Sequence, residues 1–259
     1  RFLSDGFLRP GSLPVDVPLW AGEKGHLSGS DRAGSRGRAP RVLSGCGAYR
    51  RCVSVHIRSI GTAVPPTELP QTQARDLFAG QPGINRLGAR LIGAAFDGSA
   101  INRRHTVVDA LAGGEASALV ADGQVLDAST GARNQLYAER VPELLLGAAR
   151  AALDGSGLDA SDITHVVTVS CTGFYAPGPD YEIVRGLGLS PRVQRFHLGF
   201  MGCYGAFPAL RAADAFARAD PNAVVLIVCV ELCTIHLTSS NDPEQIVATS
   251  VFADGAAAA

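Results

Sequence analysis

The segment from Arg192 to Cys233 constrains the fold more than any other part of this chain. It begins with a short stretch, RVQRFHLG, and continues through a Gly-Cys-aromatic-Gly turn into a long Ala- and Leu-rich run. It closes on AVVLIVCVELC (223–233), which has the length and composition of a buried strand. Together these pieces predict a strand–helix–strand unit. We therefore expect an α/β protein whose sheet is covered on both faces by helices.

Other segments fit the same alternation of strands and helices. The clearest helix is VPELLLGAARAALDGSG (141–157), with Pro142 in its first turn, an apolar stripe and a stop at Gly155. The apolar stripe comprises Leu145, Ala148, Ala149 and Ala152. The remaining expectations are strands at 53–61 and 164–171, short helices at 72–80 and 181–189, a helix ending near 97–98 before an exposed basic segment, a loop at 107–124, and a strand or turn from 250.

Length, charge and cysteine spacing exclude several classes of protein. The chain has 259 residues and a formal net charge of −1, so neither nucleic acid nor an acidic membrane surface is expected as a partner. No apolar run approaches the ~20 residues of a membrane-spanning helix. The six cysteines lack the spacing of a zinc site, and without a secretory signal a disulfide framework is not expected. We predict reduced thiols, no metal and a cytoplasmic protein.

The first 52 residues differ in composition from the rest. They are rich in Gly, Ser, Pro and Arg and show no sustained periodicity, which predicts a disordered extension or translated sequence upstream of the true start. The chain begins with Arg1 and stops within an alanine run, so we interpret it as a fragment. The predicted domains are therefore residues 1–52 and residues 53–259.

Cys203 is the strongest candidate for a reactive residue. It lies in the turn GFMGCYGA (199–206), directly before the Ala- and Leu-rich run. Backbone N–H groups at a helix N-terminus favour a thiolate, and Gly202 and Gly205 permit the tight backbone of a strand-to-helix turn. The same mechanics operate in the nucleophile turn of serine hydrolases. A buried structural cysteine is the alternative that the turn alone leaves open.

Five segments in order resemble the thiolase-fold condensing enzymes, and specifically the chalcone synthase-like type III polyketide synthases. They are IGTAVPP (60–66), INRRHTV (101–107), THVVTVSCTGFYAPGPDYEIVRGLGL (164–189), GFMGCYGA (199–206) and ADGAAA (253–258). The last matches a Gly-Asp-Gly-Ala-Ala-Ala turn with Ala253 in place of the first glycine. The resemblance implies the N-terminal half of a layered αβαβα fold, of a bacterial type.

The resemblance also implies a chemistry. Cys203 would accept an acyl group from acyl-CoA, and decarboxylation of malonyl-CoA would supply the enolate that extends it. CoA thioesters are substrates here, and no separate cofactor is implied. The family's histidine and asparagine belong to the C-terminal half of the fold, and no histidine of this chain can be assigned to that role. The fragment is therefore expected to be inactive alone, and the complete protein is expected to be a homodimer.

Six further positions acquire expected roles in substrate binding from the resemblance. Cys171 and Thr172 would line the cavity beside the nucleophile, and Ala176 would leave a roomier cavity than the methionine of plant members. Leu237 falls at the position taken as the plant gatekeeper phenylalanine, which favours an aliphatic starter. Arg103 and Arg104 would contact CoA phosphates at the tunnel mouth, or form a solvated basic turn.

Two other functions remain open at this point. A priming ketoacyl-ACP synthase shares the fold and an active-site cysteine, although INRRHTV and the GFMGC turn favour the type III enzymes. A non-catalytic half-domain or pseudoenzyme is the alternative from a different class. It is supported by the missing histidine and asparagine.

Overall fold

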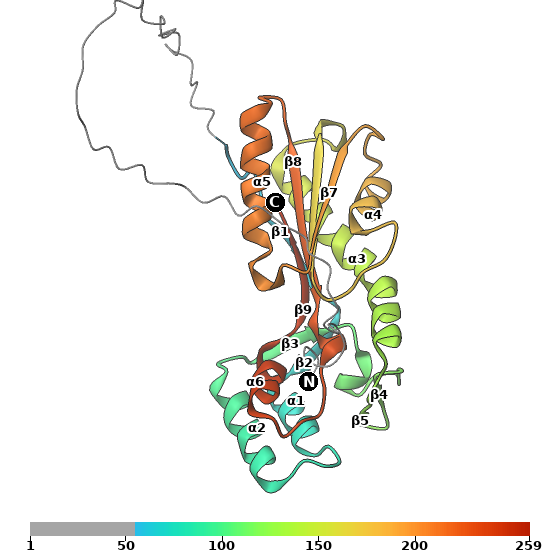
Figure 1. Ribbon diagram of the computed structural model, residues 1–259, viewed down its shortest axis with the longest axis vertical. Coiled ribbons are helices and arrows are strands. Elements are labelled where there is room, and N and C mark those ends of the chain that lie inside the picture. The colour runs from blue at the N-terminus through green and yellow to red at the C-terminus, as the bar shows by residue number, and fades with distance from the viewer. Residues whose placement is uncertain (1–54) are drawn as a thin grey trace, which may run out of the picture. The chain divides into compact units, whose positions relative to one another are not determined.

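The computed structural model describes residues 55–259, and the predicted extension at 1–52 lies outside the described residues. The described chain is built around a five-stranded mixed sheet with the order β1-β9-β8-β6-β7 (Figure 1). Its strands are β1 (Gly61–Ala63), β6 (His165–Ser170), β7 (Gln194–Gly199), β8 (Val225–Leu232) and β9 (Asp254–Ala258). The predicted α/β class is confirmed.

The central strands owe their place to continuous apolar runs. β6 pairs in parallel with both β7 and β8, whereas β9 runs antiparallel to β8 and β1. Every residue of β6 is buried, and a strand covered on both faces needs an apolar run of this kind and no alternation. The strands expected at 164–171 and within 192–199 and 223–233 are thus present.

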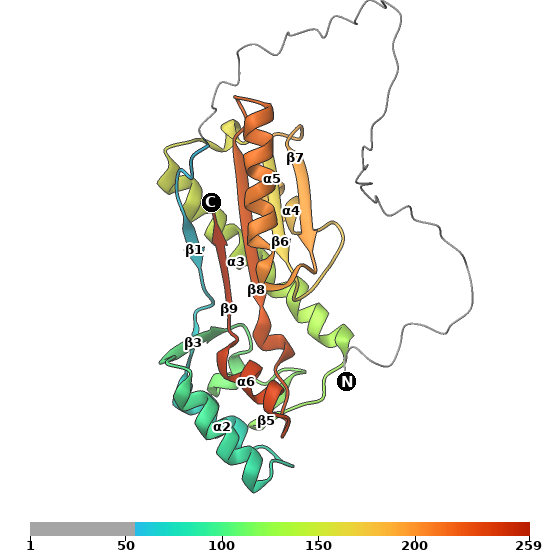
Figure 2. The ribbon, with the colours of Figure 1, turned by 60° about the vertical axis from the view of Figure 1, so that its left-hand side comes forward.

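Helices cover both faces of the sheet. α3 (Thr130–Ser156) packs on β1, β8 and β9, while α5 (Ala206–Ala219) packs on β6 and β8 from the opposite side (Figure 2). α4 (Pro179–Gly186) contacts α3, β6 and β7. The main core lies on the α3 side, and a smaller cluster of Val167, Val169, Ala209 and Ile227 lies beneath α5.

The longest helix extends far beyond the predicted span of 141–157. α3 begins after Ser129, whose side chain accepts a hydrogen bond from the Ala132 N–H, so Pro142 lies inside the helix and not in its first turn. It ends at Gly157 with φ +72°, two residues past the expected stop. Tyr137 is fully buried in the added portion, and this tertiary packing outweighs the helix-breaking tendency of proline. The predicted apolar stripe is buried as expected.

A second group of elements lies beyond the carboxyl ends of β6 and β8. It contains an antiparallel pair, β2 (Thr67–Pro70) and β3 (Arg103–Thr106), and the helices α1 (Gln71–Ala79), α2 (Arg86–Gly98) and α6 (Pro243–Val251). A short hairpin, β4 (Val120–Ala121) and β5 (Gln124–Val125), falls in the segment expected to be a loop. The basic segment expected to be an exposed turn is strand β3.

Residues 55–60 contain no regular element, although the sequence predicts a strand over 53–61. The strand begins only at Gly61, which pairs with Ala258 of β9. No strand among the described residues pairs with residues 55–60, so they are not part of the sheet. Among helices described between residues 55 and 259, none has the length and apolarity required to cross a membrane.

Candidate active site

Three segments that follow parallel strands meet at one edge of the sheet. Cys171 comes directly after β6, Cys203 lies four residues after β7, and Cys233 follows β8. Because parallel strands end at the same edge, these cysteines are brought to one region of the molecule. This is the edge at which open α/β sheets place their ligands.

Cys203 occupies the strand-to-helix turn that the sequence predicts. It is the middle residue of a single 3-10 turn, Gly202–Tyr204, which leads through Gly205 directly into α5. The Gly205 N–H donates to the Gly202 carbonyl at 2.9 Å, so the backbone winds without a break from the turn into the helix. The Cys203 side chain is exposed. The turn therefore presents a thiol at the beginning of a helix.

The turn requires glycine at two positions for different reasons. Gly202 has φ +68°, a left-handed conformation that glycine adopts without a steric penalty. A Cβ on Gly205 would lie 2.6 Å from the Val169 Cγ1, so glycine allows the start of α5 to press against β6. Phe200 also has a positive φ of 58°, and such strained residues cluster at functional sites.

Glu231 organises the segment that carries Cys171. The backbone N–H of Cys171 donates to both oxygens of the Glu231 carboxylate, at 2.9 and 3.1 Å. The Thr172 hydroxyl donates to the same carboxylate at 2.7 Å and accepts from the Leu232 N–H at 2.9 Å. The sequence analysis assigned Glu231 no role in catalysis or binding. Its position at the end of an apolar strand was the signal that could have identified it as the centre of this network.

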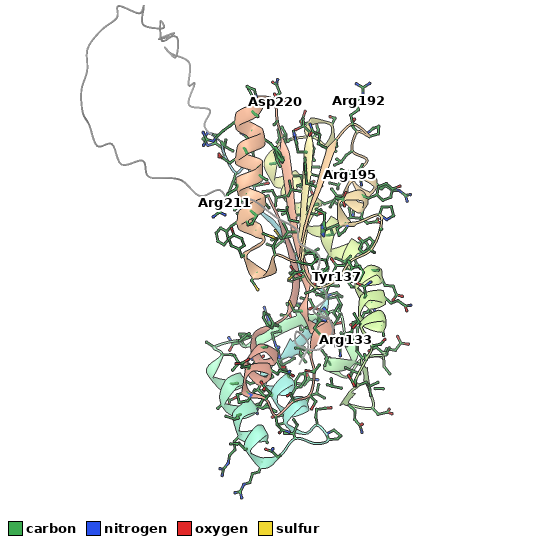
Figure 3. The ribbon with its side chains drawn as sticks, viewed as in Figure 1. Arg133, Tyr137, Arg192, Arg195, Arg211 and Asp220 are labelled. Atoms are coloured by element: carbon green, nitrogen blue, oxygen red, sulfur yellow. The ribbon has the colours of Figure 1, made fainter. Side chains whose placement is uncertain are left out.

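Burial keeps the neighbouring acidic groups in their neutral forms. It raises the pKa of the Cys171 thiol to about 11, and the nearby charge of Glu231 adds to the effect. Burial likewise raises the pKa of Cys233 to about 12 and that of Tyr137 to about 12. Tyr137, which lies on α3 near the strand ends (Figure 3), donates a hydrogen bond of 2.6 Å to the Ser170 hydroxyl. These groups are protonated at neutral pH.

Cys171 also contacts the nucleophile turn. The backbone N–H of Gly202 favours the thiolate form of Cys171 and so opposes the upward shift in its pKa. Cys171 and Thr172 are therefore positioned beside the turn that carries Cys203. Thr172 is buried and Cys171 is partly exposed.

Within residues 55–259, no histidine is hydrogen-bonded to Cys203. The His197 Nδ1 lies 2.9 Å from the Thr168 hydroxyl, and burial lowers the pKa of this imidazole. The His236 Nε2 lies 2.6 Å from the Thr172 carbonyl oxygen, with which it forms a hydrogen bond. Among the same residues, no group of three His, Cys, Asp or Glu side chains has an arrangement that could hold a metal ion.

The two arginines of β3 have different environments. Arg103 is exposed and lies 3.8 Å from the Glu68 carboxylate. Arg104 is only 3% exposed, donates to the carbonyls of Thr249 and Phe252, and stacks over Phe96. Burial lowers the pKa of Arg104 to about 10. The guanidinium of Arg104 therefore faces the interior of the protein, whereas the sequence led us to expect it to face solvent.

Ala176 and Leu237 also differ in their surroundings. Ala176 lies exposed in the loop between β6 and α4. Leu237 is 7% exposed and belongs to the main hydrophobic core. The larger cavity described, of about 560 Å³, is lined by neither residue and does not include Cys203. Cys203 is exposed and lies outside that cavity.

Comparison with protein families gives one match that spans most of the chain. Residues 48–259 match the family described as chalcone and stilbene synthases, N-terminal domain. Among curated proteins, "Probable polyketide synthase 1" of Dictyostelium discoideum is 31% identical over 211 residues, which are 82% of this chain and 6% of that protein. "Alpha-pyrone synthesis polyketide synthase-like Pks18" of Mycobacterium tuberculosis is 40% identical over 126 residues, covering 49% of this chain and 32% of that protein.

Solved structures resemble the same region. The C-terminal type III polyketide synthase domain of Steely1, a type I/III hybrid from Dictyostelium, superimposes with a TM-score of 0.68 and 30% identity. PKS-I from the brown alga Ectocarpus siliculosus gives a TM-score of 0.70 and 30% identity. Each comparison covers 78% of this chain and 54% of the solved chain. The chain thus spans about half the length of these structures and a smaller share of the curated relatives.

Proposed function

This chain belongs to the family of chalcone and stilbene synthases, whose N-terminal domain it matches, and from that premise we propose that Cys203 is the acyl acceptor of a decarboxylative condensing enzyme. The observation that carries the proposal is an exposed thiol in a strand-to-helix turn that continues directly into α5. The N–H groups at the start of a helix stabilise negative charge on such a sulfur. Similarity to type III polyketide synthases supports the same assignment.

The proposed reaction has two stages. First, the Cys203 thiolate attacks the carbonyl carbon of an acyl-CoA thioester, the carbon–sulfur bond to CoA breaks, and CoA leaves as a thiolate that takes up a proton. Second, malonyl-CoA loses carbon dioxide and its enolate carbon attacks the acyl-enzyme, which releases the Cys203 thiolate. The product remains attached to CoA and is longer by two carbons. Following the family resemblance, enolate stabilisation is assigned to the histidine and asparagine of the C-terminal half of the fold. Among residues 55–259, no histidine is hydrogen-bonded to Cys203.

The remaining site residues receive roles within this proposal. Cys171 and Thr172 line the acyl pocket beside the nucleophile, held in place by the Glu231 carboxylate. Ala176 leaves space at the exposed loop after β6, and Arg103 supplies an accessible cation for CoA phosphate. Arg104 is left out of this role because its guanidinium is buried, and Leu237 acts from within the core, where it shapes the wall behind the pocket.

The proposals about the oligomeric state of the complete enzyme and about its bacterial type rest on the family resemblance alone. We extend the proposal to a symmetric homodimer of the complete enzyme, supported by the family relationship. The cysteine at position 171 favours a bacterial type. The matched relatives come from Dictyostelium, Mycobacterium and rice, so the comparisons establish only the broader family.

Acyl transfer to Cys203 can be measured directly by intact mass after incubation with an acyl-CoA. Loading needs only the nucleophile, so we expect a gain of one acyl group in the unaltered chain and no gain in Cys203→Ser, although we expect no condensation by this chain alone. Cys229→Ser is the matched control, because this thiol lies within β8 and burial raises its pKa to about 11. Labelling that survives Cys203→Ser, or no labelling of either this chain or a longer one, would reject the proposal and favour a non-catalytic half-domain.

A further inference from the structure

Cys171 and Cys203 are two thiols at the carboxyl ends of neighbouring strands. β6 and β7 pair in parallel, and Ser170 lies opposite Gly199 in their register. Cys171 is the residue directly after β6, and Cys203 lies in the turn after β7. Both are free cysteines. The acyl-transfer proposal uses the sulfur of Cys203 and gives the sulfur of Cys171 no chemical role.

The turn after β7 folds back over the end of β6. At its start, the Phe200 N–H donates to the Ser170 carbonyl at 3.2 Å. At its end, Gly205 lies so close to β6 that an added Cβ would be 2.6 Å from the Val169 Cγ1. Cys203 lies between these two contacts, and therefore beside the residue that follows β6.

Short-range effects on the Cys171 thiol agree with this placement. Burial is the main cause of the raised pKa of Cys171, but the Cys203 thiol also raises this pKa and the Gly202 N–H opposes the shift. Both contributions come from the nucleophile turn and act over a few ångströms. The Cα atoms of a disulfide are about 4.4–6.8 Å apart, and neighbouring strands lie about 4.8 Å apart. The strand spacing therefore falls within the range that a disulfide requires.

The third thiol at this edge of the sheet is farther from Cys203. Cys233 follows β8, which lies on the opposite side of β6 from β7. Two strand spacings, about 10 Å, therefore separate the end of β8 from the end of β7. In agreement, Cys171 raises the pKa of Cys233 more than Cys203 does. Cys171, at the end of the central strand, is the partner that Cys203 can reach.

The two thiols differ in reactivity, and this difference fixes the order of events. Cys203 lies at the beginning of α5, where backbone N–H groups favour the thiolate, and the thiolate is the form that peroxides oxidise. Burial raises the pKa of Cys171 to about 11, so this thiol is protonated at neutral pH and reacts slowly with peroxide. Cys203 is therefore oxidised first, and Cys171 acts on the product.

We infer that Cys171 and Cys203 form a reversible disulfide when the chain meets a peroxide. The Cys203 thiolate attacks one oxygen of hydrogen peroxide, the O–O bond breaks, and the leaving hydroxide takes up a proton to become water. Cys203 is then a sulfenic acid. The Cys171 sulfur attacks the Cys203 sulfur, the S–O bond breaks, and hydroxide leaves as water with the proton of the Cys171 thiol. The peroxide is reduced to two water molecules, and the two thiols together lose two electrons.

The disulfide protects the nucleophile from irreversible oxidation. A sulfenic acid that meets more peroxide becomes a sulfinic and then a sulfonic acid, which thiol reductants do not reverse. Capture by Cys171 stops this oxidation at a product that a thiol reductant converts back. The consequence for acyl transfer rests on the proposed function of Cys203, whereas formation of the disulfide does not.

A tryptic peptide map of the 259-residue chain tests the inference, because trypsin separates the relevant thiols. Cleavage after arginine places them on three peptides, with Cys171 in residues 151–185, Cys203 in residues 196–211, and Cys229 and Cys233 in residues 219–259. After treatment with a small excess of hydrogen peroxide and alkylation of the remaining thiols, we expect the first two peptides to be cross-linked. Dithiothreitol should separate them, and the oxidised chain should migrate as a monomer in a non-reducing gel.

Two variants and a matched control locate the bond. In Cys171→Ser the cross-link should be lost, and Cys203 should instead gain two or three oxygen atoms that dithiothreitol does not remove. In Cys203→Ser no cross-link should form. Cys229→Ser should behave as the unaltered chain, because this thiol lies within β8 and burial raises its pKa to about 11. Circular dichroism verifies that each variant is folded.

Acyl loading after peroxide and then dithiothreitol measures the protection. We expect loading to return in the unaltered chain and in Cys229→Ser, and to be lost in Cys171→Ser. A chain that forms the disulfide and never accepts an acyl group would contradict the proposed function and leave this inference standing.

Three results would overturn the inference. The first is the absence of the cross-linked peptide from the unaltered chain, whether Cys203 stays a thiol or is oxidised irreversibly. The second is a bond from Cys203 to the peptide 219–259, which would assign the partner thiol to β8 or to the segment after it. The third is a cross-link found only in dimers, which would place the two thiols on different chains.

Discussion

Two carboxylates connect separate segments of the chain by accepting hydrogen bonds from their backbone N–H groups. Glu231 binds the Cys171 N–H and the Thr172 hydroxyl, and so connects the end of β8 to the end of β6. Asp254 makes an equivalent connection in the interior, where it accepts from the backbone N–H groups of Val107 and Thr234. The sequence analysis assigned neither carboxylate a role. Only the folded chain shows which segments they join.

Asp254 should make the stability of the chain depend on pH. Burial raises the pKa of its carboxyl from 3.8 to about 6, despite the hydrogen bonds that it accepts from Thr234 and Val107. Between these values the folded chain binds more protons than the unfolded chain, so the free energy of unfolding falls as the pH rises. The contribution is present below about pH 4 and lost above about pH 6, and it amounts to roughly 2–3 kcal/mol.

Urea unfolding at pH 4 and pH 7 tests this prediction. Asp254→Asn does not titrate, so between the two pH values the unaltered chain should lose about 2–3 kcal/mol more stability than this variant. Glu115→Gln, at an exposed position, serves as the control and should follow the unaltered chain. Parallel pH profiles for the unaltered chain and Asp254→Asn would contradict the assignment.

At the scale of elements, the sequence predicts best those segments whose packing follows from their own composition. β6 and β8 are apolar runs buried in the sheet, and the stripe at Leu145 and Ala148 marks the buried face of α3. The turn at Cys203 was also recognisable, because glycine is required at Gly202 and Gly205 for reasons that act within a few residues.

Elements that depend on distant partners were mispredicted. Pro142 is tolerated inside α3 because Tyr137 and Val141 are buried against the rest of the fold, which no local pattern reveals. Arg104 is read as a surface cation from its type, yet the carbonyls that it binds belong to residues 145 and 148 positions later in the chain. In residues 55–60, apolar and polar residues alternate as in a strand, but no described strand pairs with them, so they form no strand.

The contact between α5 and β6 gives a prediction at this scale. Gly205→Ala would place a Cβ 2.6 Å from the Val169 Cγ1, and the helix start would have to move off the sheet. Overpacking of this kind costs about 1–3 kcal/mol in the free energy of unfolding. Gly93→Ala is the matched control: it lies inside α2 with open space around the added methyl group, and alanine should stabilise the helix by up to about 1 kcal/mol. Thermal unfolding measures both changes, and loss of stability in both variants, or in neither, would contradict the packing argument.

At the scale of the whole described chain, the two sides of the sheet are covered to different extents. α3 buries a continuous face in the main core, whereas Ala209 is the fully buried residue of α5. The α5 helix and the turn before it carry exposed apolar residues. They are Phe200, Met201, Tyr204, Phe207 and Leu210. We refer to these residues as the α5 surface, since exposed apolar side chains concentrated in this way mark a place where another protein surface packs.

This surface should make the 259-residue chain self-associate. Phe207 is 59% exposed, and burying a side chain of this size contributes about 1.5–3 kcal/mol to association. Phe207→Ser should therefore raise the concentration at which light scattering exceeds that of a monomer by about tenfold or more. Leu87→Ser is the control, because Leu87 is 64% exposed on α2, outside this surface, and single exposed apolar residues are ordinary. If both substitutions reduce scattering equally, association follows general hydrophobicity; if only Phe207→Ser does, the α5 surface is the one that binds.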